Sequence, residues 1–177
     1  MIRLFAGIEI PDAVQDALMG LERPIEGARW VEAFNLHLTL RFIGDIDERM
    51  AAAVDEALEQ VRGAPFALTL SGLGTFGEGR RLHTLWAGVR PSEPLAILQG
   101  RTEAACRRAG LAPETRKFTP HVTVARLKAP PEEKIARLLQ EENLFAAGPF
   151  PVTRFVLYSS HAVDGGRHYE PERFYAL

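Results

Sequence analysis

The sequence has little cysteine and no large excess of charge of either sign. Cys106 is the only cysteine among 177 residues, so no disulfide can form within the chain, and a reducing compartment is expected. The net charge of −2 excludes a broad basic field that would hold long nucleic acids without specificity. The N-terminal residues lack the pattern of a signal peptide, and no hydrophobic run is long enough to span a membrane. A cytoplasmic protein that is not bound to a membrane is therefore expected.

Several catalytic signatures are also missing. The five histidines and the one cysteine form no spacing typical of metal ligands, so a metal site is not expected. There is no Gly-x-Ser-x-Gly motif and no P-loop, which argues against a serine hydrolase and an NTPase. The glycines at 72, 74 and 77 spell a dinucleotide fingerprint, but a strand rather than a helix is expected after them. We read that segment as a hairpin connection and expect no cofactor.

The apolar patterns predict an α+β protein. Asp47 and Ser92 are expected to cap the second and third of four helices. The predicted strands cover residues 3–10, 36–43, 66–73, 82–89, 121–127, 152–159 and 169–176, and the helices cover 11–21, 47–61, 94–109 and 130–141. The order of elements resembles one unit used twice, which favours two similar lobes in a single bilobal domain spanning residues 1–177.

Two short segments carry the same pattern, histidine, aliphatic residue, threonine, aliphatic residue. The first contains His37 and Thr39, and the second contains His121 and Thr123. Each falls on a predicted strand, where residues two apart share a face. The aliphatic neighbours would pack against helices and leave the polar face open. If a pseudo-twofold axis relates the lobes, two imidazoles and two hydroxyls meet across a cleft.

Such a cleft suits a cyclic phosphodiester. Imidazole titrates near neutral pH, so one histidine can accept a proton while the other donates one. Opening a 2′,3′-cyclic phosphate needs both acts, because the attacking water loses a proton and the departing ribose oxygen gains one. Threonine hydroxyls can hydrogen-bond the nonbridging phosphate oxygens. This chemistry requires no metal.

The two motifs are similar to those of the two-histidine (2H) phosphoesterase superfamily. Residues 3–11, 30–31, 35–44 and 118–126 also look like the corresponding segments of bacterial RNA 2′,3′-cyclic phosphodiesterases, also called 2′-5′ RNA ligase-like proteins. The resemblance implies two pseudo-symmetric lobes, with antiparallel sheets facing a central cleft and helices outside. It also implies hydrolysis of RNA 2′,3′-cyclic phosphate ends, or of small cyclic nucleotides, to 2′-phosphomonoesters. By that analogy His37 is the proton donor and His121 the proton acceptor, although the near-symmetry leaves an exchange of roles open.

Further residues are candidates for substrate contact. Arg126 matches the end of the family's motif and could bind phosphate, although strict alternation turns it away from His121. Arg41 has the strand parity of His37 and could border the cleft. Phe118 could stack a base at the rim, whereas Phe42 has the parity of the core. His83 is interpreted as structural or exposed.

Two alternatives to cyclic phosphate hydrolysis stay open. The first is a 2′-5′ RNA ligase or phosphodiesterase, since ligation would reverse the same chemistry. The second is a module that binds RNA ends or nucleotides without turnover. His161 and His168 are expected at a solvated hairpin tip, and the protein is expected to be a monomer.

Overall fold

The computed structural model describes residues 1–177 and has an α+β fold, as the sequence predicts. The helices are α1 (Asp12–Met19), α2 (Glu48–Glu59), α3 (Glu93–Arg108) and α4 (Glu132–Glu141). The strands are β1 (Ile2–Glu9), β2 (Ala28–Trp30), β3 (His37–Ile46), β4 (Phe66–Phe76), β5 (Thr84–Val89), β6 (His121–Leu127), β7 (Ala146–Val152), β8 (Arg154–Val163) and β9 (Gly166–Ala176). Single 3₁₀ turns lie at Ala33–Asn35 and Gly79–Arg81. No helix has the length and apolar character that crossing a membrane would require.

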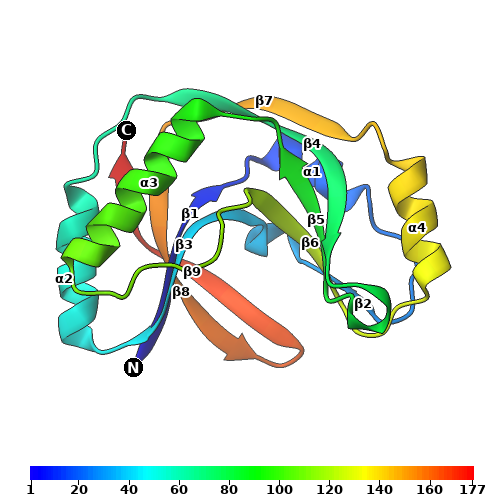
Figure 1. Cartoon of the computed structure of the whole chain (residues 1–177), viewed down its shortest axis with the longest axis horizontal. Coiled ribbons are helices and arrows are strands. Elements are labelled where there is room, and N and C mark those ends of the chain that lie inside the picture. The colour runs from blue at the N-terminus through cyan, green and yellow to red at the C-terminus, as the bar shows by residue number, and fades with distance from the viewer.

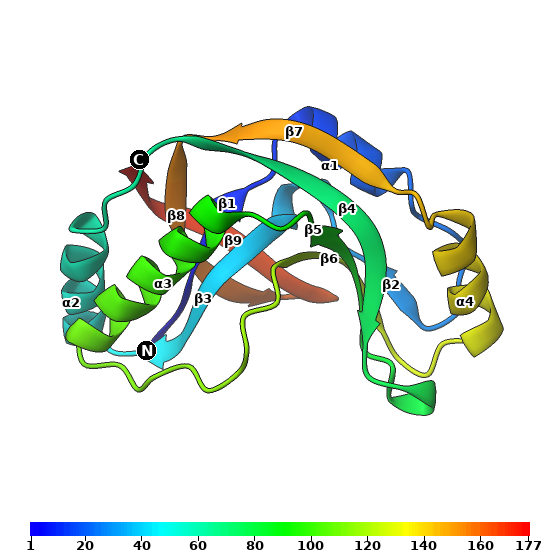
Figure 2. The same ribbon diagram turned by 45° about the horizontal axis from the view of Figure 1, so that its top comes forward.

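The nine strands form one antiparallel sheet rather than two separate ones. Its order is β7-β4-β5-β6-β3-β1-β8-β9, with β2 paired to β6. The sheet bends into an arch, with α2 and α3 over one arm and α1 and α4 over the other (Figures 1 and 2). We call the arm with β1, β3, β8 and β9 lobe 1, and the arm with β2 and β4 to β7 lobe 2. The lobes meet where β3 pairs with β6.

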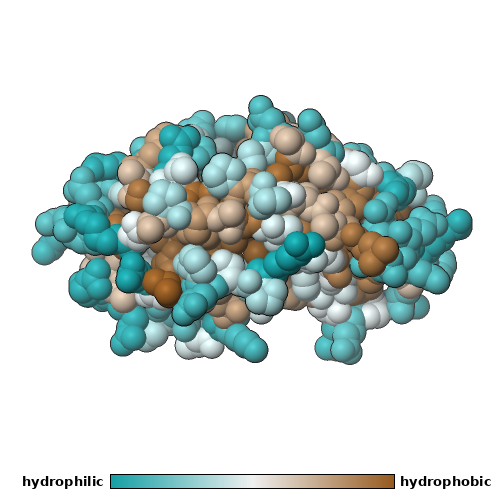
Figure 3. Space-filling model, turned by 90° about the horizontal axis from the view of Figure 1, so that it is seen from above, coloured by the Kyte–Doolittle hydropathy of each residue, from teal (hydrophilic) through white to brown (hydrophobic).

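Each arm buries apolar side chains beneath its helices. The main core contains residues from both lobes, including Leu38 on β3 and Val122 on β6, which are fully buried. The side chain of Asp47 accepts a hydrogen bond from the Met50 amide, and that of Ser92 accepts one from the Leu95 amide, so both expected caps are confirmed. Seen from above, hydrophilic side chains gather at the two ends of the molecule and more apolar ones lie between them (Figure 3).

Two strands lie where none was predicted. β2 has only three residues, too few to show a period. β7 contains Pro149 and Pro151, which cannot donate to a strand ladder and so argue against a strand. The sheet tolerates both prolines because β7 is an edge strand, paired only with β4. Edge position depends on the whole topology, so the local sequence does not reveal it.

The glycines that spell the dinucleotide fingerprint lie in β4 and in the turn that follows it. A Cβ atom on Gly74 would lie 2.3 Å from the indole of Trp86, so glycine leaves the room that this ring occupies. Gly72 and Gly77 have φ angles of 74° and 87°, which glycine adopts without strain. After Gly77 the chain makes a short 3₁₀ turn and enters β5. The hairpin interpretation is therefore confirmed, and no helix terminus is available for a pyrophosphate.

Matching β-bulges interrupt the two motif strands. On β3, Thr39 pairs with Gly7 and Arg41 with Ala6, which leaves Leu40 as an extra residue. On β6, Thr123 pairs with Trp86 and Ala125 with Leu85, which leaves Val124 as an extra residue. A bulge reverses the alternation of the residues that follow it. The first six residues of both strands accordingly share one burial pattern, with the sixth side chain exposed.

The bulge places Arg41 on the helix side of the sheet, contrary to the prediction that it borders the cleft. The side chain is only 8% exposed. Its Nε atom donates to the carboxylate of Glu103 on α3, and its Nη1 atom donates to the Phe42 carbonyl. Its Nη2 atom donates to the carbonyl of Ala112 at 2.6 Å. Arg41 therefore links β3 to α3 and to the loop after that helix.

Replacing Glu103 with alanine is expected to lower the free energy of unfolding by about 2 kcal/mol, because it leaves a buried cation without its charged partner. Chemical denaturation would measure the loss. Glu56→Ala is the matched control, since Glu56 lies exposed on α2 and makes no side-chain hydrogen bond or ion pair. Equal stability of the two variants would contradict a structural role for the Arg41–Glu103 pair.

Candidate active site

One strand pair brings the two motifs together. Leu38 on β3 pairs with Val122 on β6 in antiparallel register, and both side chains are buried. The four motif side chains flank this pair and project from the opposite, open face of the sheet. The antiparallel register sets His37 beside Thr123 and Thr39 beside His121. A pseudo-twofold relation between the repeated motifs, as the sequence predicts, would centre on the Leu38–Val122 pair.

Hydrogen bonds fix the tautomers of both histidines in the same way. His37 Nδ1 lies 2.7 Å from the carbonyl oxygen of Asn35, and His121 Nδ1 lies 2.7 Å from that of Thr119. A carbonyl oxygen can only accept, so each Nδ1 carries a hydrogen and donates it. The Nε2 atom of a neutral ring is then bare. His37 Nε2 lies 3.1 Å from Thr39 Oγ1, whose hydroxyl can donate to it.

The surroundings favour neutral imidazoles in the free protein. Burial lowers the pKa of His37 to about 4, against a smaller opposing effect of its bond to the Asn35 carbonyl. Burial likewise lowers the pKa of His121. The positive charge of Arg126 contributes to the lowering at both rings. An anion bound between the histidines would act in the opposite direction, because a negative charge favours their protonated forms.

Arg126 reaches the open face because of the bulge at Val124. Without it, Arg126 would point to the helix side, as strict alternation predicts. Arg126 pairs with Thr84 of β5 in the sheet, and its Nη1 atom donates to Thr84 Oγ1 at 3.4 Å. The Thr84 side chain is 2% exposed and also lies 2.8 Å from Nδ1 of His83. A buried hydroxyl thus helps to hold the guanidinium near both histidines.

Aromatic rings surround each histidine, and the sequence alone did not indicate them. The ring of His37 lies 4.6 Å from Phe5 and 5.0 Å from Tyr169 between centroids, with Tyr158 at 6.0 Å. These aromatic residues come from β1, β8 and β9. The alternation of β1 could have placed Phe5 on one face, but nothing local indicates that β8 and β9 lie beside it. The rings supply the burial that lowers the pKa of His37.

The surroundings of His121 are also aromatic. Phe76 of β4 lies 4.9 Å from the His121 ring in an edge-on arrangement, and Trp86 of β5 lies 6.0 Å away. On the lobe 1 side, Tyr158 and Tyr169 also line a cavity of about 400 Å³ together with Phe34. Aromatic faces of this kind can stack nucleobases. Both histidines therefore lie between apolar rings rather than in open solvent.

The other residues that the sequence singled out lie in different parts of the structure. Phe42 follows the bulge of β3 and is 44% exposed, so its predicted place in the core is wrong. It occupies the position on β3 that Arg126 occupies on β6. Phe118 is partly buried and packs against the main core, and Arg41 lies on the other side of the sheet. Cys106 is buried on α3, and burial raises the pKa of its thiol to about 11.

Potential metal ligands gather elsewhere. Where the sequence spacing indicated no metal site, the folded chain brings His161, Glu170 and Glu172 together on the β8–β9 hairpin, with ligand atoms within 4.8 Å of one another. It is the single group of three or more such side chains in the structure. None of its members belongs to the site around His37 and His121.

Comparison with known proteins identifies the family. The model of the 2′-5′ RNA ligase superfamily matches residues 10–164. Proteins named RNA 2′,3′-cyclic phosphodiesterase are similar over most of the chain. The one from Thermotoga maritima is 31% identical over 175 residues, covering 96% of this chain and 92% of its own. The one from Escherichia coli K12 is 30% identical over 186 residues, covering 99% of this chain and 96% of its own.

Solved structures agree with this assignment. The crystal structure of E. coli LigT complexed with 3′-AMP superposes with a TM-score of 0.78 at 28% identity, covering 99% of this chain and 98% of that one. The crystal structure of TT0787 from Thermus thermophilus gives 0.78 at 27% identity, covering 99% and 97%. Sequence and fold therefore agree over nearly the whole chain, and the protein belongs to the 2′-5′ RNA ligase superfamily.

Proposed function

We propose that the protein hydrolyses 2′,3′-cyclic phosphate ends of RNA to 2′-phosphomonoesters by metal-independent acid–base catalysis. The observation that carries the proposal is the Leu38–Val122 strand pair, because it sets two histidines and two threonines on one open face. Relatives named RNA 2′,3′-cyclic phosphodiesterase, which match over most of their length, support the same reaction. The two histidines come from different lobes, so residues 1–177 act as a single catalytic unit.

Each proposed role follows from an atom that the geometry leaves available. Nε2 of His121 accepts a proton from water as the water oxygen attacks phosphorus. The bond from phosphorus to the 3′ oxygen breaks, and Nε2–H of His37 donates a proton to that oxygen. Thr39 and Thr123 donate hydrogen bonds to the nonbridging oxygens. The guanidinium of Arg126 stabilises the charge that develops on them.

The low pKa of His37 bears on this assignment. With a pKa of about 4, the free protein holds His37 neutral at pH 7, whereas a proton donor must be protonated. The cyclic phosphate carries a negative charge and would raise the pKa of His37 when bound beside it. Substrate binding would then create the acid. In the exchanged assignment, with His121 as donor, the bound phosphate would have to raise the pKa of His121, which burial also lowers.

The test is incubation of the purified protein with a short RNA ending in a 2′,3′-cyclic phosphate, in excess EDTA. The expected product is a single 2′-phosphate end, identified by mass and by sensitivity to phosphatase. A second reaction with an added 5′-hydroxyl RNA would reveal joined product if the protein acts as a 2′-5′ ligase. Binding of the cyclic end by folded protein without turnover would support a binding module and contradict the proposed hydrolysis.

Thr84 is expected to act as a positioning residue for Arg126. Thr84→Val keeps the shape of the side chain but removes the hydroxyl that accepts from Arg126, and should lower kcat/KM roughly three- to tenfold. Thr84→Ser retains the hydroxyl and is expected to restore most of the activity. Steady-state kinetics would measure both, with thermal unfolding as a check on folding. A valine variant with wild-type kcat/KM would show that Arg126 needs no such support.

A further inference from the structure

The β8–β9 hairpin carries four potential metal ligands on one face. In its register His161 pairs with His168, and Ser159 pairs with Glu170, so both histidines and Glu170 project from the same side as Ser159. A register shift between Leu157 and Tyr158 leaves one extra residue on β9, before Arg173. Glu172 lies at that shift and contacts the hydroxyl of Ser159. The opposite face of the hairpin carries Tyr158 and Tyr169, which contact His37.

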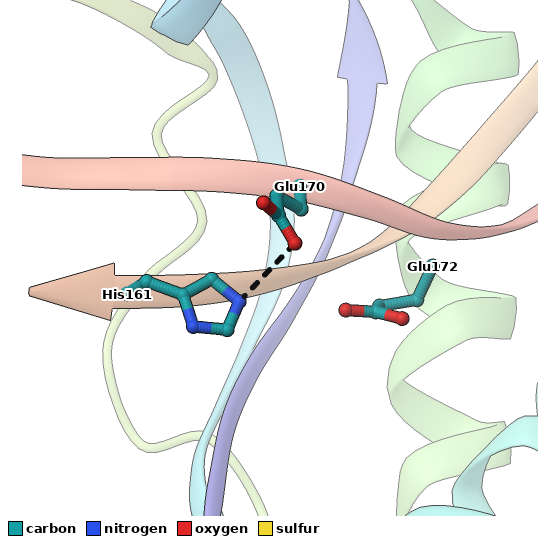
Figure 4. A group of neighbouring side chains, drawn as sticks. All are labelled: His161, Glu170 and Glu172. Carbon is teal, nitrogen blue, oxygen red and sulfur yellow. Dashed lines mark ion pairs between the residues drawn. The ribbon is translucent and has the colours of Figure 1, made fainter.

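Distances within this cluster are too long for hydrogen bonds but suit ligands that share an ion. Nε2 of His161 lies 3.6 Å from Oε2 of Glu170, and Nε2 of His168 lies 3.7 Å from Oε1 of the same carboxylate. Around a tetrahedral zinc ion with bonds of about 2.0–2.1 Å, neighbouring ligand atoms lie about 3.3 Å apart. Small rotations of exposed side chains would close that difference. Figure 4 shows His161 and Glu170 directed toward each other, with Glu172 beside them.

The negative charge of this cluster is not compensated by arginine or lysine. Exposed carboxylates on the neighbouring strands β1 and β3 are paired with arginine, Glu9 with Arg154 and Asp45 with Arg3. Glu170 has only the two histidines within ion-pair distance, and Glu172 has no ion pair. Two carboxylates beside two imidazoles attract a divalent cation without competition from a side-chain ammonium or guanidinium group.

A buried serine contacts two of the proposed ligands in the metal-free chain. Ser159 is 1% exposed, and its Oγ lies 2.7 Å from Nε2 of His161. The carboxylate of Glu172 can only accept, so the serine hydroxyl donates to it, and Nε2–H of His161 donates to Oγ. A metal ion would replace the proton on Nε2, and a neutral ring would carry its hydrogen on Nδ1 instead. The hydrogen bond from His161 to Ser159 would then be lost, and the serine hydroxyl would go on positioning the carboxylate of Glu172.

We propose that His161, Glu170 and Glu172, with His168 as a fourth ligand, bind a divalent transition metal ion of the Zn²⁺ type. Imidazole nitrogen with carboxylate oxygen suits Zn²⁺, Co²⁺ and Ni²⁺ better than Mg²⁺ or Ca²⁺, which prefer oxygen ligands alone. The ion would join β8 to β9 across the hairpin, on the face opposite the catalytic histidines. It would be structural and take no part in hydrolysis, so the proposal does not depend on the proposed function.

The experiment is titration of the metal-free full chain with Zn²⁺ by calorimetry and with Co²⁺ by visible absorption. One ion per chain is expected, with an intense d–d band for Co²⁺ and a Zn²⁺-dependent rise in Tm. His161→Ala and Glu172→Gln should each weaken binding at least about tenfold. Both variants should retain wild-type hydrolysis in EDTA. His83→Ala is the matched control, since it removes a histidine from another part of the surface.

The catalytic histidines are themselves possible zinc ligands, so a double variant is needed. In His37→Ala/His121→Ala the hairpin site should bind Zn²⁺ with unchanged affinity. Loss of binding in that double variant would overturn the proposal, because it would place the ion between the catalytic histidines. Equal affinity of the wild type and the two hairpin variants would also overturn it. So would the absence of any Co²⁺ band in folded wild-type protein.

Discussion

Replacing either His37 or His121 with alanine is expected to lower kcat for hydrolysis of a 2′,3′-cyclic phosphate about 100- to 10,000-fold. That is the usual contribution of one positioned acid or base. Both rings lie beside the Leu38–Val122 strand pair, and both present Nε2 because Nδ1 donates to a backbone carbonyl. Single-turnover kinetics in EDTA, with thermal unfolding to confirm folding, would measure the losses.

Two further variants sharpen this experiment. The double variant His37→Ala/His121→Ala is expected to lose little more activity than the worse single variant, since the two groups act on one transition state. His168→Ala removes an exposed histidine from the hairpin and serves as the matched control. Full activity in either catalytic variant would exclude that ring from the chemistry. Equal losses in the His168 variant would indicate a general effect of histidine replacement.

A modified substrate can assign the acid and the base. A cyclic phosphate with sulfur in place of the 3′ bridging oxygen releases a thiolate, which leaves without a proton. The variant that lacks the acid should therefore recover much of its rate on this substrate, while the variant that lacks the base should not. The proposed roles predict recovery for His37→Ala. Recovery for His121→Ala alone would instead support the exchanged assignment.

Local sequence predicted the motif strands well but could not predict how they continue. The alternation from His37 to Leu40, and from His121 to Val124, gives the correct faces for all four motif side chains. The bulges at Leu40 and Val124 then reverse the parity. Parity alone assigned Arg41 to the cleft, Phe42 to the core and Arg126 away from His121, and each of these placements fails after the bulge. Neither bulge has a local signature, because each extra residue is an ordinary aliphatic one.

Contacts that depend on which strands are neighbours in the sheet could not be predicted from the sequence. Tyr169 contacts His37 although 132 positions separate them, and the contact exists because β8 pairs with β1 and β9 with β8. The group of His161, Glu170 and Glu172 likewise forms only when the hairpin sets its register. Motif spacing along the chain cannot reveal ligands that come from two strands. The amphipathic helices and their caps, by contrast, depend on neighbouring residues and were predicted closely.

The half-buried His37 is expected to make the stability of the protein depend on pH below neutrality. Its pKa is about 4 in the folded chain and near 6.5 when unfolded. Between these values the unfolded chain binds the additional proton, so the free energy of unfolding falls as the pH falls from 6.5 toward 4. Above pH 6.5 both forms are neutral and the full stability is present. A shift of this size corresponds to a loss of at most about 3 kcal/mol at pH 4.

Denaturant unfolding of the wild type and His37→Gln at pH 7.5, 5.5 and 4.5 would measure this contribution. Carboxylates also titrate toward the acid end, and the pKa of Glu114 is lowered to about 2 by Arg116, so the comparison must be between the two proteins at each pH. Glutamine cannot take up the proton, so the wild type should lose stability more steeply than the variant. His168→Gln is the control and should follow the wild type. Parallel curves for His37→Gln and the wild type would mean that His37 is readily protonated in the folded protein. A fraction of His37 would then already be protonated near neutral pH before substrate binds.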